Sequence, residues 1–525
     1  MNRVERERTL NGILHIPDLK LKLAFEGMLV GLFAGTMITV LRLCLGFVME
    51  NRRTAVLFLR SLPPVYILFW VAGLILVAGF IAGLVRWVPV AGGSGIPQIR
   101  SIVLGLEKSR HWMRVLLVKL LATATGIGAG LSMGREGPSV QIGGMAGQGV
   151  GRFLDNTNLE TRALISSGAG AGIAAAFNAP LAGVLFTMEI IHKNMSALVM
   201  VPTLMASTTA TLLVHNVFGH ETVLDIPRME IMPVNYLPQL VGLGILTGLA
   251  GVAFNKGTFA VGKFYQLPVF KNSWMRIGFA LLLTIPVTYF LPQILGAGDN
   301  LIEAMVDLEG SLPLILIYLV GKFFFTLFST ASGAPGGSLQ PMLVLGSLCG
   351  GLYGGALAQL GMLPENFRLH MVVFGMAGLF TGSVRGPVTS VLLLLEMTGR
   401  FYHLVPLCIV VIFAYAAAEI CEDTPIFDAM LEKSLKAKSS NPNLMAAPRE
   451  QHLLEVAVEG GSYAEGKTLA QIHFPGNALV ISVRRGDMEL IPRGNTLLLA
   501  GDYVYLLPNH GKLSELHKIF RCKTG

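Results

Sequence analysis

The sequence predicts an all-α polytopic membrane protein that carries a small α/β domain at its C-terminal end. Two observations predict the membrane part. Of the 525 residues, 53% are hydrophobic and only 14% are charged, and many apolar runs approach the length of a membrane span. A third observation predicts the separate domain, because the composition becomes polar and rich in turn residues after about residue 439. The mean hydropathy of +0.62 excludes a soluble enzyme with a large core.

Apolar runs of spanning or near-spanning length recur along most of the chain. They cover residues 23–48, 65–88, 115–130, 197–217, 237–261, 277–295, 314–327 and 404–418. Several other runs are shorter and rich in glycine, which favours discontinuous helices over simple spans. The charged residues 1–20 are expected to form a surface helix on the cytoplasmic side, and no cleavable signal peptide is visible.

Charge and cysteine usage restrict the partners and cofactors. The net charge of +8 is modest, and basic cytoplasmic loops of a membrane protein explain it better than a nucleic-acid surface. Membrane lipid is therefore an expected partner, and nucleic acid is not. The five cysteines have neither metal-like nor disulfide-like spacing, so no metal or cofactor is expected; they are Cys44, Cys349, Cys408, Cys421 and Cys522.

Two short motifs recur in the same order. Residues 134–141 align with residues 333–340, and residues 178–189 align with residues 385–396. The first alignment matches Gly134 with Gly333, and the second keeps a proline and a glutamate at the same separation. These features favour a duplicated membrane unit, with halves of about residues 23–217 and 236–421, over chance recurrence of Gly, Ser and Pro. The alignment alone does not show whether the halves are inverted.

Glu136 is the most informative single residue. It lies in a long apolar stretch, where a carboxylate is costly unless it is paired or lines a wet cavity, so it marks a transport pathway. The glycines and the proline of residues 134–138 break any continuous helix there. Non-helical backbone at membrane depth must be buried in protein or line a cavity. A titratable group beside a helix break suits a gate or a proton site of an ion pathway.

Three glycine-rich turns each precede a predicted helix, at residues 93–97, 134–138 and 333–338. An anion in a membrane needs hydrogen-bond donors without a full counter-charge, so that it can also leave. Backbone N–H groups at helix N-termini provide such donors, and Ser94 adds a hydroxyl. Each turn alone also suits close helix packing. Together with Glu136, the three turns favour an anion pathway.

At these residues the chain resembles the CLC family of chloride channels and chloride/proton antiporters. The motifs are Gly-Ser-Gly-Ile-Pro at 93–97, Gly-Arg-Glu-Gly-Pro at 134–138, Gly-Gly-Ser-Leu-Gln-Pro at 336–341 and Ala-Phe-Asn-Ala-Pro-Leu-Ala-Gly at 176–183. The resemblance covers roughly residues 23–435. It implies an inverted repeat of tilted and discontinuous helices in a membrane domain of residues 1–438. It also implies a homodimer in the inner membrane, with one pathway per subunit and both termini in the cytoplasm.

The resemblance also assigns roles to residues of these motifs. Ser94 would donate its hydroxyl to a central chloride, and Glu136 would be the external gate that swings aside when protonated. Backbone N–H groups near Ser338 and Leu339 would complete the anion site. The other anion-binding positions carried over are Gly95, Ile96, Arg135, Gly137 and Phe427. Lys119 is expected to raise the positive potential for anions, with snorkelling to an interface as the alternative.

Two positions depart from the antiporter pattern of the family. Ile190 stands where those antiporters have an inner, proton-transferring glutamate, and Phe427 stands where they have a tyrosine that caps the anion site. The missing hydroxyl is worth roughly 0.5–1.5 kcal/mol. Glu189 could replace the inner glutamate, but the matched Glu396 favours a structural role. We expect chloride/proton exchange gated by Glu136, with loose coupling allowed, and keep a passive voltage- or pH-gated chloride channel as the alternative.

Residues 445–525 are expected to form the small α/β domain, after a linker at residues 441–443. Alternating runs at 453–458, 478–484 and 503–507 predict its strands. Turn signatures at residues 466–469, 483–486, 491–496 and 500–502 resemble the C-terminal subdomain of RCK/TrkA regulatory proteins. Such domains dimerise and bind small cytosolic ligands. The tail is therefore expected either to regulate transport through a ligand or to stabilise a dimer.

Two other function classes are disfavoured. The tail raises potassium transport as a hypothesis, but the chain has no Thr-Val-Gly-Tyr-Gly filter that would supply rings of carbonyls. A membrane enzyme is not expected either, because the sequence has no zinc, nucleophile-elbow or phosphate-loop signature.

Overall fold

The computed structural model divides the chain into two compact units, Met1–Lys433 and Ser434–Gly525. The described residues are 3–61, 63, 67–107, 111–219, 224, 229–306, 311–438, 454–474, 478–485, 488–507 and 519–520. The expected linker at residues 441–443 lies outside them. Each unit is described by itself below.

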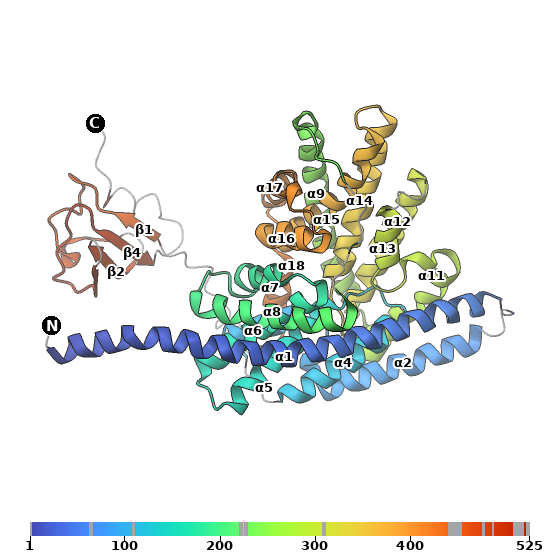
Figure 1. The fold of residues 1–525 in the computed structure, drawn as a ribbon, viewed down its shortest axis with the longest axis horizontal. Helices are drawn as coiled ribbons and strands as arrows, with labels where there is room; N and C mark the ends of the chain where they lie inside the picture. The colour runs from blue at the N-terminus through green and yellow to red at the C-terminus, as the bar shows by residue number, and fades with distance from the viewer. Residues whose placement is uncertain are drawn as a thin grey trace. The chain divides into compact units, whose positions relative to one another are not determined.

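Helices make up the regular structure of the first unit, as the sequence predicts. Its first half contains α1 (Arg3–Ser61), α2 (Ile67–Trp87), α3 (Ile96–Val103), α4 (Trp112–Gly128), α5 (Glu136–Phe153), α6 (Asn158–Phe177), α7 (Pro180–Phe186) and α8 (Ala197–Phe218). Its second half contains α9 (Leu237–Phe264), α10 (Ser273–Leu282), α11 (Thr284–Phe290), α12 (Asp299–Val306), α13 (Leu312–Ala331), α14 (Leu339–Gln359), α15 (Arg368–Val384), α16 (Pro387–Thr398) and α17 (Leu404–Ile420), followed by α18 (Ile426–Lys438). Figure 1 shows the labelled helices of the first half, α1 to α8, in blue to green below α9, which is also green, and the yellow-to-orange helices α12 to α17 of the second half.

Nine helices in the described part of the chain are long and apolar enough to cross a membrane. The expected run at residues 115–130 forms α4, whose 17 residues make it shorter than these nine. Residues 277–295 are broken between α10 and α11. Two further spans, Leu339–Gln359 and Glu365–Val384, come from glycine-rich segments and are 72% and 94% buried. These two glycine-rich segments are therefore continuous helices, whereas the predicted discontinuous helices are found at α10 and α11 and in the short helices α7 and α16.

Hydrogen bonds between the halves show that a two-fold axis relates them. Gly134 lies two residues before the first residue of α5, and Gly337 lies two residues before the first residue of α14. The two glycines are therefore matched in the repeat. These matched residues exchange both backbone bonds, with N···O distances of 2.7 and 2.8 Å. A mutual exchange between equivalent residues places a two-fold axis between them. The sequence alignment of Gly134 with Gly333 is therefore wrong by four residues, because glycine recurs at both spacings.

A second pair of bonds obeys the same axis. Counting from α3 and α12 matches Gly93 with Gly296, whose φ angles are both 67°. The Gly93 N–H donates to Gly333 O at 3.2 Å, and the Gly296 N–H donates to Gly130 O at 3.0 Å. Gly130 and Gly333 are themselves matched in the count from α5 and α14. The backbone geometry thus confirms the expected duplication and shows that a two-fold axis relates its halves.

Glycines let the central helices of each half approach closely. A Cβ placed on Gly143 of α5 would lie 2.0 Å from the carbonyl oxygen of Gly168 of α6, so no larger residue fits. In the second half, a Cβ on Gly346 of α14 would lie 2.5 Å from Gly375 O of α15. Small residues at such crossings are typical of membrane helix pairs.

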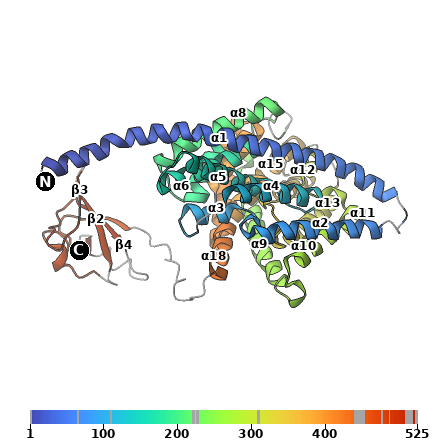
Figure 2. The same cartoon turned by 90° about the horizontal axis from the view of Figure 1, so that it is seen from below.

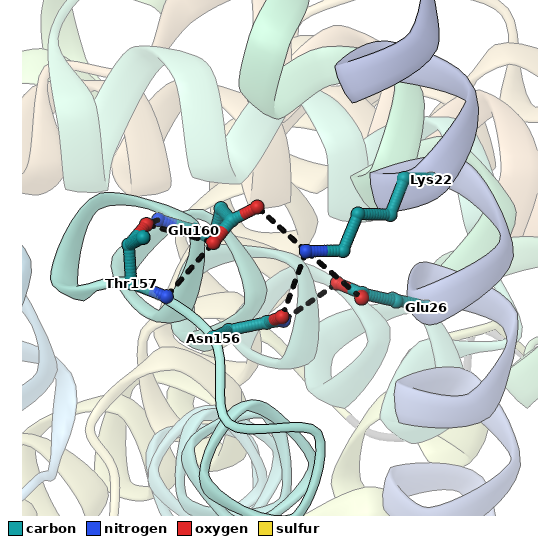
Figure 3. A network of polar contacts seen from close by, with 5 residues as sticks. All are labelled: Lys22, Glu26, Asn156, Thr157 and Glu160. Carbon is teal, nitrogen blue, oxygen red and sulfur yellow. Dashed lines mark hydrogen bonds and ion pairs between the residues drawn. The ribbon is translucent and has the colours of Figure 1, made fainter.

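A polar network fastens α1 to the start of α6. Lys22 Nζ lies 2.7 Å from Glu160 Oε1 and 3.0 Å from Asn156 Oδ1, and Asn156 donates to Glu26 Oε2 at 2.7 Å (Figure 3). Glu160 also accepts the N–H of Thr157 at 2.8 Å, which completes the capping box of α6. Helix α1 runs past the other helices of the first half in Figure 2, and this network fixes its register near residue 22.

The described residues of the second unit contain a four-stranded antiparallel sheet in the order β1-β4-β2-β3. Its strands are β1 (Leu454–Ala457), β2 (Leu479–Arg485), β3 (Met488–Leu490) and β4 (Tyr503–Leu507). The three predicted runs correspond to β1, β2 and β4, whereas β3 was not predicted because it is only three residues long. A small core forms behind the sheet from Val456, Val483, Val504 and Leu506, among others.

One ion pair joins the end of β2 to the residue before β4, the two central strands of this sheet. Arg485 donates twice to Asp502, at 2.8 and 2.7 Å, and the Leu499 N–H donates to the same carboxylate at 2.9 Å. Burial alone would raise the pKa of Asp502, but these hydrogen bonds and the charge of Arg485 lower it more, so its pKa lies below the ordinary value. The hydrogen bonds to Asp502 raise the pKa of Arg485.

Candidate functional site

The three glycine-rich turns meet at the centre of the first unit. Gly93 in the first turn donates to Gly333 O in the third, and Gly336 donates back to Gly93 O at 3.1 Å. The second turn joins the third through the exchanged bonds of Gly134 and Gly337. Because each turn directly precedes a helix, the N-termini of α3, α5 and α14 converge. The sequence predicted the three turns separately, and the structure brings all of them together.

The first turn places a hydroxyl in the buried space before α3. The Oγ of Ser94 is buried and has no hydrogen-bonding partner among the described residues. Gly95 follows in the left-handed region, with φ of 103°, and its N–H donates to Gln98 Oε1 at 3.0 Å. The N–H of Gly95 is thereby occupied, so this residue shapes the turn. Ile96 is the fully buried first residue of α3, where helical N–H groups lack partners within the helix.

Glu136 lies at the first residue of α5 and is only 1% exposed. Its Oε2 accepts the backbone N–H of Gln340 in the first turn of α14, at 3.3 Å. A Cβ on Gly134 would lie 2.1 Å from the same oxygen, so the glycine makes room for the carboxylate. The side chain of one half is thus held against the helix N-terminus of the other half.

Around Glu136, the backbone of the second turn is in direct contact with the first turn. A Cβ on Gly137 would lie 2.7 Å from Ser94 Oγ, which puts the backbone of α5 in contact with the first turn. Ser338 is the N-cap of α14, and its Oγ is buried without a partner among the described residues. Leu339 follows it as the first helical residue and is 1% exposed. Two unpartnered hydroxyls and a carboxylate therefore share a polar centre within an apolar core.

Two buried lysines, one in each half, donate hydrogen bonds to backbone carbonyls of a turn. Lys119 of α4 donates to the carbonyls of Ala91 and Gly93, at 3.1 and 2.6 Å. Lys322 of α13 donates to Ile294 O and Gly296 O, at 3.0 and 2.7 Å. Both side chains are 0% exposed. Snorkelling to an interface is therefore the wrong description of Lys119, which instead fixes the turn that carries Ser94.

Two of the predicted anion-site residues, Arg135 and Phe427, lie at the starts of α5 and α18. Arg135, the N-cap of α5, donates to the carbonyl of Ala176 at 3.3 Å. Phe427 is 2% exposed in the first turn of α18. Its neighbour Asp428 forms ion pairs with Arg100 of α3 and, at 2.5 Å, with Lys193. These pairs hold α18 beside α3, as Figure 2 shows, and fix the position of Phe427.

Ile190 and Glu189 lie on a π-helical segment, Thr187–His192. Ile190 is 4% exposed, and its side chain packs against Gly386. Glu189 accepts the N–H groups of Val388 and Thr389, at 3.1 and 2.7 Å, and so caps α16 of the second half. The expected structural role of Glu189 is confirmed by these bonds.

Glu396 mirrors this cap. It accepts the N–H groups of Leu181 and Ala182, at 3.0 and 2.7 Å, and caps α7 of the first half. The residues aligned before these helices, Asn178 and Arg385, share a left-handed backbone with φ of 57° and 60°. The second sequence alignment is therefore correct, and it describes two reciprocal helix caps.

Three polar residues at the centre were not predicted from the sequence. Gln340 joins Glu136 through its backbone and donates from Nε2 to Asp299 Oδ1 at 2.7 Å. Asp299 is the first residue of α12, the counterpart of Ile96 in α3. The signal that could have found Lys322 is its spacing, because it follows Gly296 by the same number of residues that separates Lys119 from Gly93.

Family models match both units. The model described as voltage-gated chloride channel matches residues 74–419, and the TrkA-C domain model matches residues 453–521. Among curated proteins, the H(+)/Cl(-) exchange transporter ClcA of Vibrio campbellii is 32% identical over 468 residues, covering 82% of this chain and 97% of the relative. The protein of the same name from Vibrio vulnificus is 33% identical over 448 residues, covering 81% and 93%.

Solved structures resemble the fold. A slow cyanobacterial Cl-/H+ antiporter superposes with a TM-score of 0.73 at 29% identity, covering 80% of this chain and 99% of that chain. A CLC-type fluoride/proton antiporter superposes with a TM-score of 0.65 at 22% identity, covering 76% and 96%, which is a likeness of fold alone. The three converging turns, the family model over most of the membrane unit and these relatives agree: the chain belongs to the CLC family of voltage-gated chloride channels and transporters.

Proposed function

We propose that this protein exchanges chloride for protons across the membrane, through a pathway centred on the three turns. The observation that carries the proposal is the buried carboxylate of Glu136, held by a backbone N–H at the start of α14. A helix N-terminus that holds a carboxylate also suits a free anion. The relatives are named as H(+)/Cl(-) exchange transporters, which supports the same activity.

The anion site that this geometry favours lies between the first and third turns. Ser94 Oγ and Ser338 Oγ are buried and have no partner among the described residues, so a chloride between them would satisfy polar atoms that are costly to leave unpaired. Backbone N–H groups of Ile96 and Leu339, at the starts of α3 and α14, are the further donors. Arg135 adds positive potential at the edge of the site, and Phe427 closes its inner side.

Exchange follows from competition for the helix N-termini. An ionised Glu136 occupies the start of α14 and blocks the pathway there. A proton removes its charge, weakens its hold on the Gln340 N–H and lets the side chain turn away, so that chloride takes the vacated position. One carboxylate thus links the arrival of a proton to the movement of an anion. Gly134 and Gly137 provide the space that this side chain needs.

The inner proton route has no carboxylate at its usual position in such antiporters. Ile190 is buried and apolar, and Glu189 is bound to the N-terminus of α16. Protons therefore have to cross the inner half through water, which favours loose coupling. The same observation supports the second candidate, a passive chloride channel in which Glu136 is only a gate.

Assembly and location form a further part of the proposal. We place the protein in the bacterial inner membrane as a homodimer, with both termini in the cytoplasm. The spans expose large apolar side chains, such as Leu68, Phe69 and Val405, which lipid or a second copy would cover. The TrkA-C match supports binding of a small cytosolic ligand by the tail.

The test is simultaneous measurement of chloride efflux and proton uptake in liposomes that contain the purified protein. A chloride gradient should drive protons uphill, and Glu136→Ala should abolish proton movement while chloride still flows. Glu365→Gln, which removes an exposed carboxylate far along the sequence, is the matched control and should behave as wild type. Chloride efflux without uphill proton movement in the wild type would make the protein a channel or an uncoupled carrier, and proton pumping that persists in Glu136→Ala would contradict the role of Glu136.

A further inference from the structure

Asp299 occupies a special place in the inverted repeat. The turn of residues 93–95 leads into α3, and its counterpart, residues 296–298, leads into α12; Gly95 and Gly298 have φ angles of 103° and 96°. The backbone is the same, but Ala297 replaces Ser94 and Asp299 replaces Ile96. An axis in the membrane plane puts the two turns on opposite sides of the centre. One half therefore presents a hydroxyl to the centre, and the other half presents a carboxylate.

Asp299 connects to the gate through one residue. Its Oδ1 accepts the side-chain N–H of Gln340 at 2.7 Å, and the backbone N–H of Gln340 donates to Glu136 at 3.3 Å. Exposure falls along this line: Asn300 is exposed, Asp299 is half-buried, Gln340 is 4% exposed and Glu136 is 1% exposed. These residues lead from the surface of the unit to the buried Glu136. Among them, Asp299 is the ionisable residue that is still partly exposed to water.

The charges around Asp299 come from three other elements. Arg42 and Arg52 of α1, Lys322 of α13 and Glu136 of α5 are near enough for their charges to interact with that of Asp299, the three cations by attraction and Glu136 by repulsion. Helices α14 and α15 and the short segment Pro292–Ile294 pack on α12. Helix α14 contributes Gln340 but no charged residue, α15 carries Arg368 and His370 in its first turn, and Glu303 lies one turn along α12 itself. Gln340 thus links the half-buried carboxylate of Asp299, which has these cations nearby, to the buried carboxylate of Glu136.

We infer that Asp299 collects protons for Glu136 on the side from which this gate opens. The inference rests on the proposed function of Glu136. Asp299 takes a proton from bulk water and passes it through water to the Glu136 carboxylate, so one carboxylic acid becomes a carboxylate and the other the reverse. Gln340 is the positioning residue, because it holds both carboxylates at once. Chains of acidic residues are the usual proton relays within membranes.

The rate at which protons arrive determines the pH range in which a proton-collecting residue limits exchange. At a diffusion limit of 10⁹–10¹⁰ M⁻¹s⁻¹, one group receives about 10–100 protons per second at pH 8, and about a thousand times more at pH 5. A half-buried collector therefore limits exchange at alkaline pH and is dispensable in acid. A purely structural residue at the N-terminus of α12 would act equally at both pH values.

The experiment compares Asp299→Asn with wild type in liposomes at symmetric pH 8 and pH 5. We expect proton flux at pH 8 to fall on the order of tenfold, with little change at pH 5, and Asp299→Glu to restore it. Asn300→Ala, at the exposed neighbouring position, should match wild type. In a Glu136→Ala background, Asp299→Asn should leave chloride flux unchanged, because the collector acts only through the gate.

Three results would overturn the inference. They are an Asp299→Asn variant whose fluxes match wild type at pH 8, a loss that is equal at both pH values, and a loss of chloride flux that persists in the Glu136→Ala background. If the wild type itself pumps no protons, exchange fails as the proposed function, and the readout becomes the rate at which chloride flux activates after a jump from pH 8 to pH 7. Asp299→Asn should then slow this activation several-fold, and an unchanged rate would refute the collector independently.

Discussion

In the first half of the membrane unit, a turn supported by Lys119 carries Ser94 and Ile96; in the second half, a turn supported by Lys322 carries Ala297 and Asp299. The lysine, its carbonyl partners and the backbone angles agree between the halves. The residues that face the centre do not. Duplication has therefore kept the groups that shape the turn and varied the groups that meet the ion. Substitutions of the supporting groups should act alike in both halves, whereas substitutions of the facing groups should not.

The largest effect should come from the two supporting lysines. Lys119→Met and Lys322→Met each leave two buried carbonyls without their charged donor, and such hydrogen bonds are worth about 1.5–3 kcal/mol. Both variants should lose similar stability in thermal unfolding of the detergent-solubilised protein. Function should separate them: Lys119→Met should weaken chloride binding about 10- to 100-fold, and Lys322→Met should impair proton flux.

Lys256→Met, on an exposed position of α9, is the control for removing a lysine and should be nearly neutral. A stability loss confined to one of the two buried variants would show that the turns are not equivalent. An equal loss of chloride affinity in both would show that the second turn also contributes to the anion site.

Ser94→Ala tests the facing groups. The Ser94 hydroxyl has no partner among the described residues, so its removal should not lower stability. It should weaken chloride binding by about tenfold, because a hydrogen bond to an anion is lost. Calorimetric titration of chloride into the purified protein measures this. Ser101→Ala removes an equally buried hydroxyl farther along α3 and should have no effect on binding; matching losses in both variants would argue against Ser94 as an anion donor.

The reciprocal caps should give smaller and equal effects. Glu189→Gln and Glu396→Gln each remove a negative charge from a helix N-terminus while keeping an acceptor oxygen. We expect each to lower the free energy of unfolding by about 1 kcal/mol, with proton flux unchanged. Denaturant titration in detergent checks the first part, and the liposome assay checks the second. Loss of proton coupling in Glu189→Gln alone would mean that Glu189, and not water, carries protons past Ile190.

The sequence predicted the features of this site that depend on local chemistry. Glycine-rich turns before helices, a carboxylate at membrane depth and paired Pro–Glu motifs are all visible in the chain. Features that depend on the axis between the halves were missed, because a weak repeat can be aligned in more than one register. Gly134 has its true partner in Gly337, and only the exchanged backbone bonds show this. Asp299 was missed for the same reason, since its counterpart Ile96 is apolar.

The smallest effect is expected in the second unit, at the ion pair of Arg485 and Asp502. The pKa of Asp502 lies below its ordinary value, so its pair with Arg485 stabilises the sheet fully above the ordinary aspartate pKa of about 3.9. This stability is lost as the pH falls through the lower, folded-state pKa. Because Arg485 is partly exposed, we expect Asp502→Asn to cost only about 0.5–1 kcal/mol at neutral pH. Faster hydrogen exchange of β2 and β4 amides in the full-length protein should report it.

The difference between Asp502→Asn and wild type should begin to shrink as the pH falls below about 4, and it should disappear only below the lowered pKa of folded Asp502, where the wild-type carboxylate is also protonated. A difference that persists there would mean that the asparagine disrupts packing and not charge. If the difference is constant from pH 5 to pH 8, the pair of Arg485 and Asp502 does not titrate within that range. A change in transport between pH 5 and pH 8 then does not arise from this ion pair.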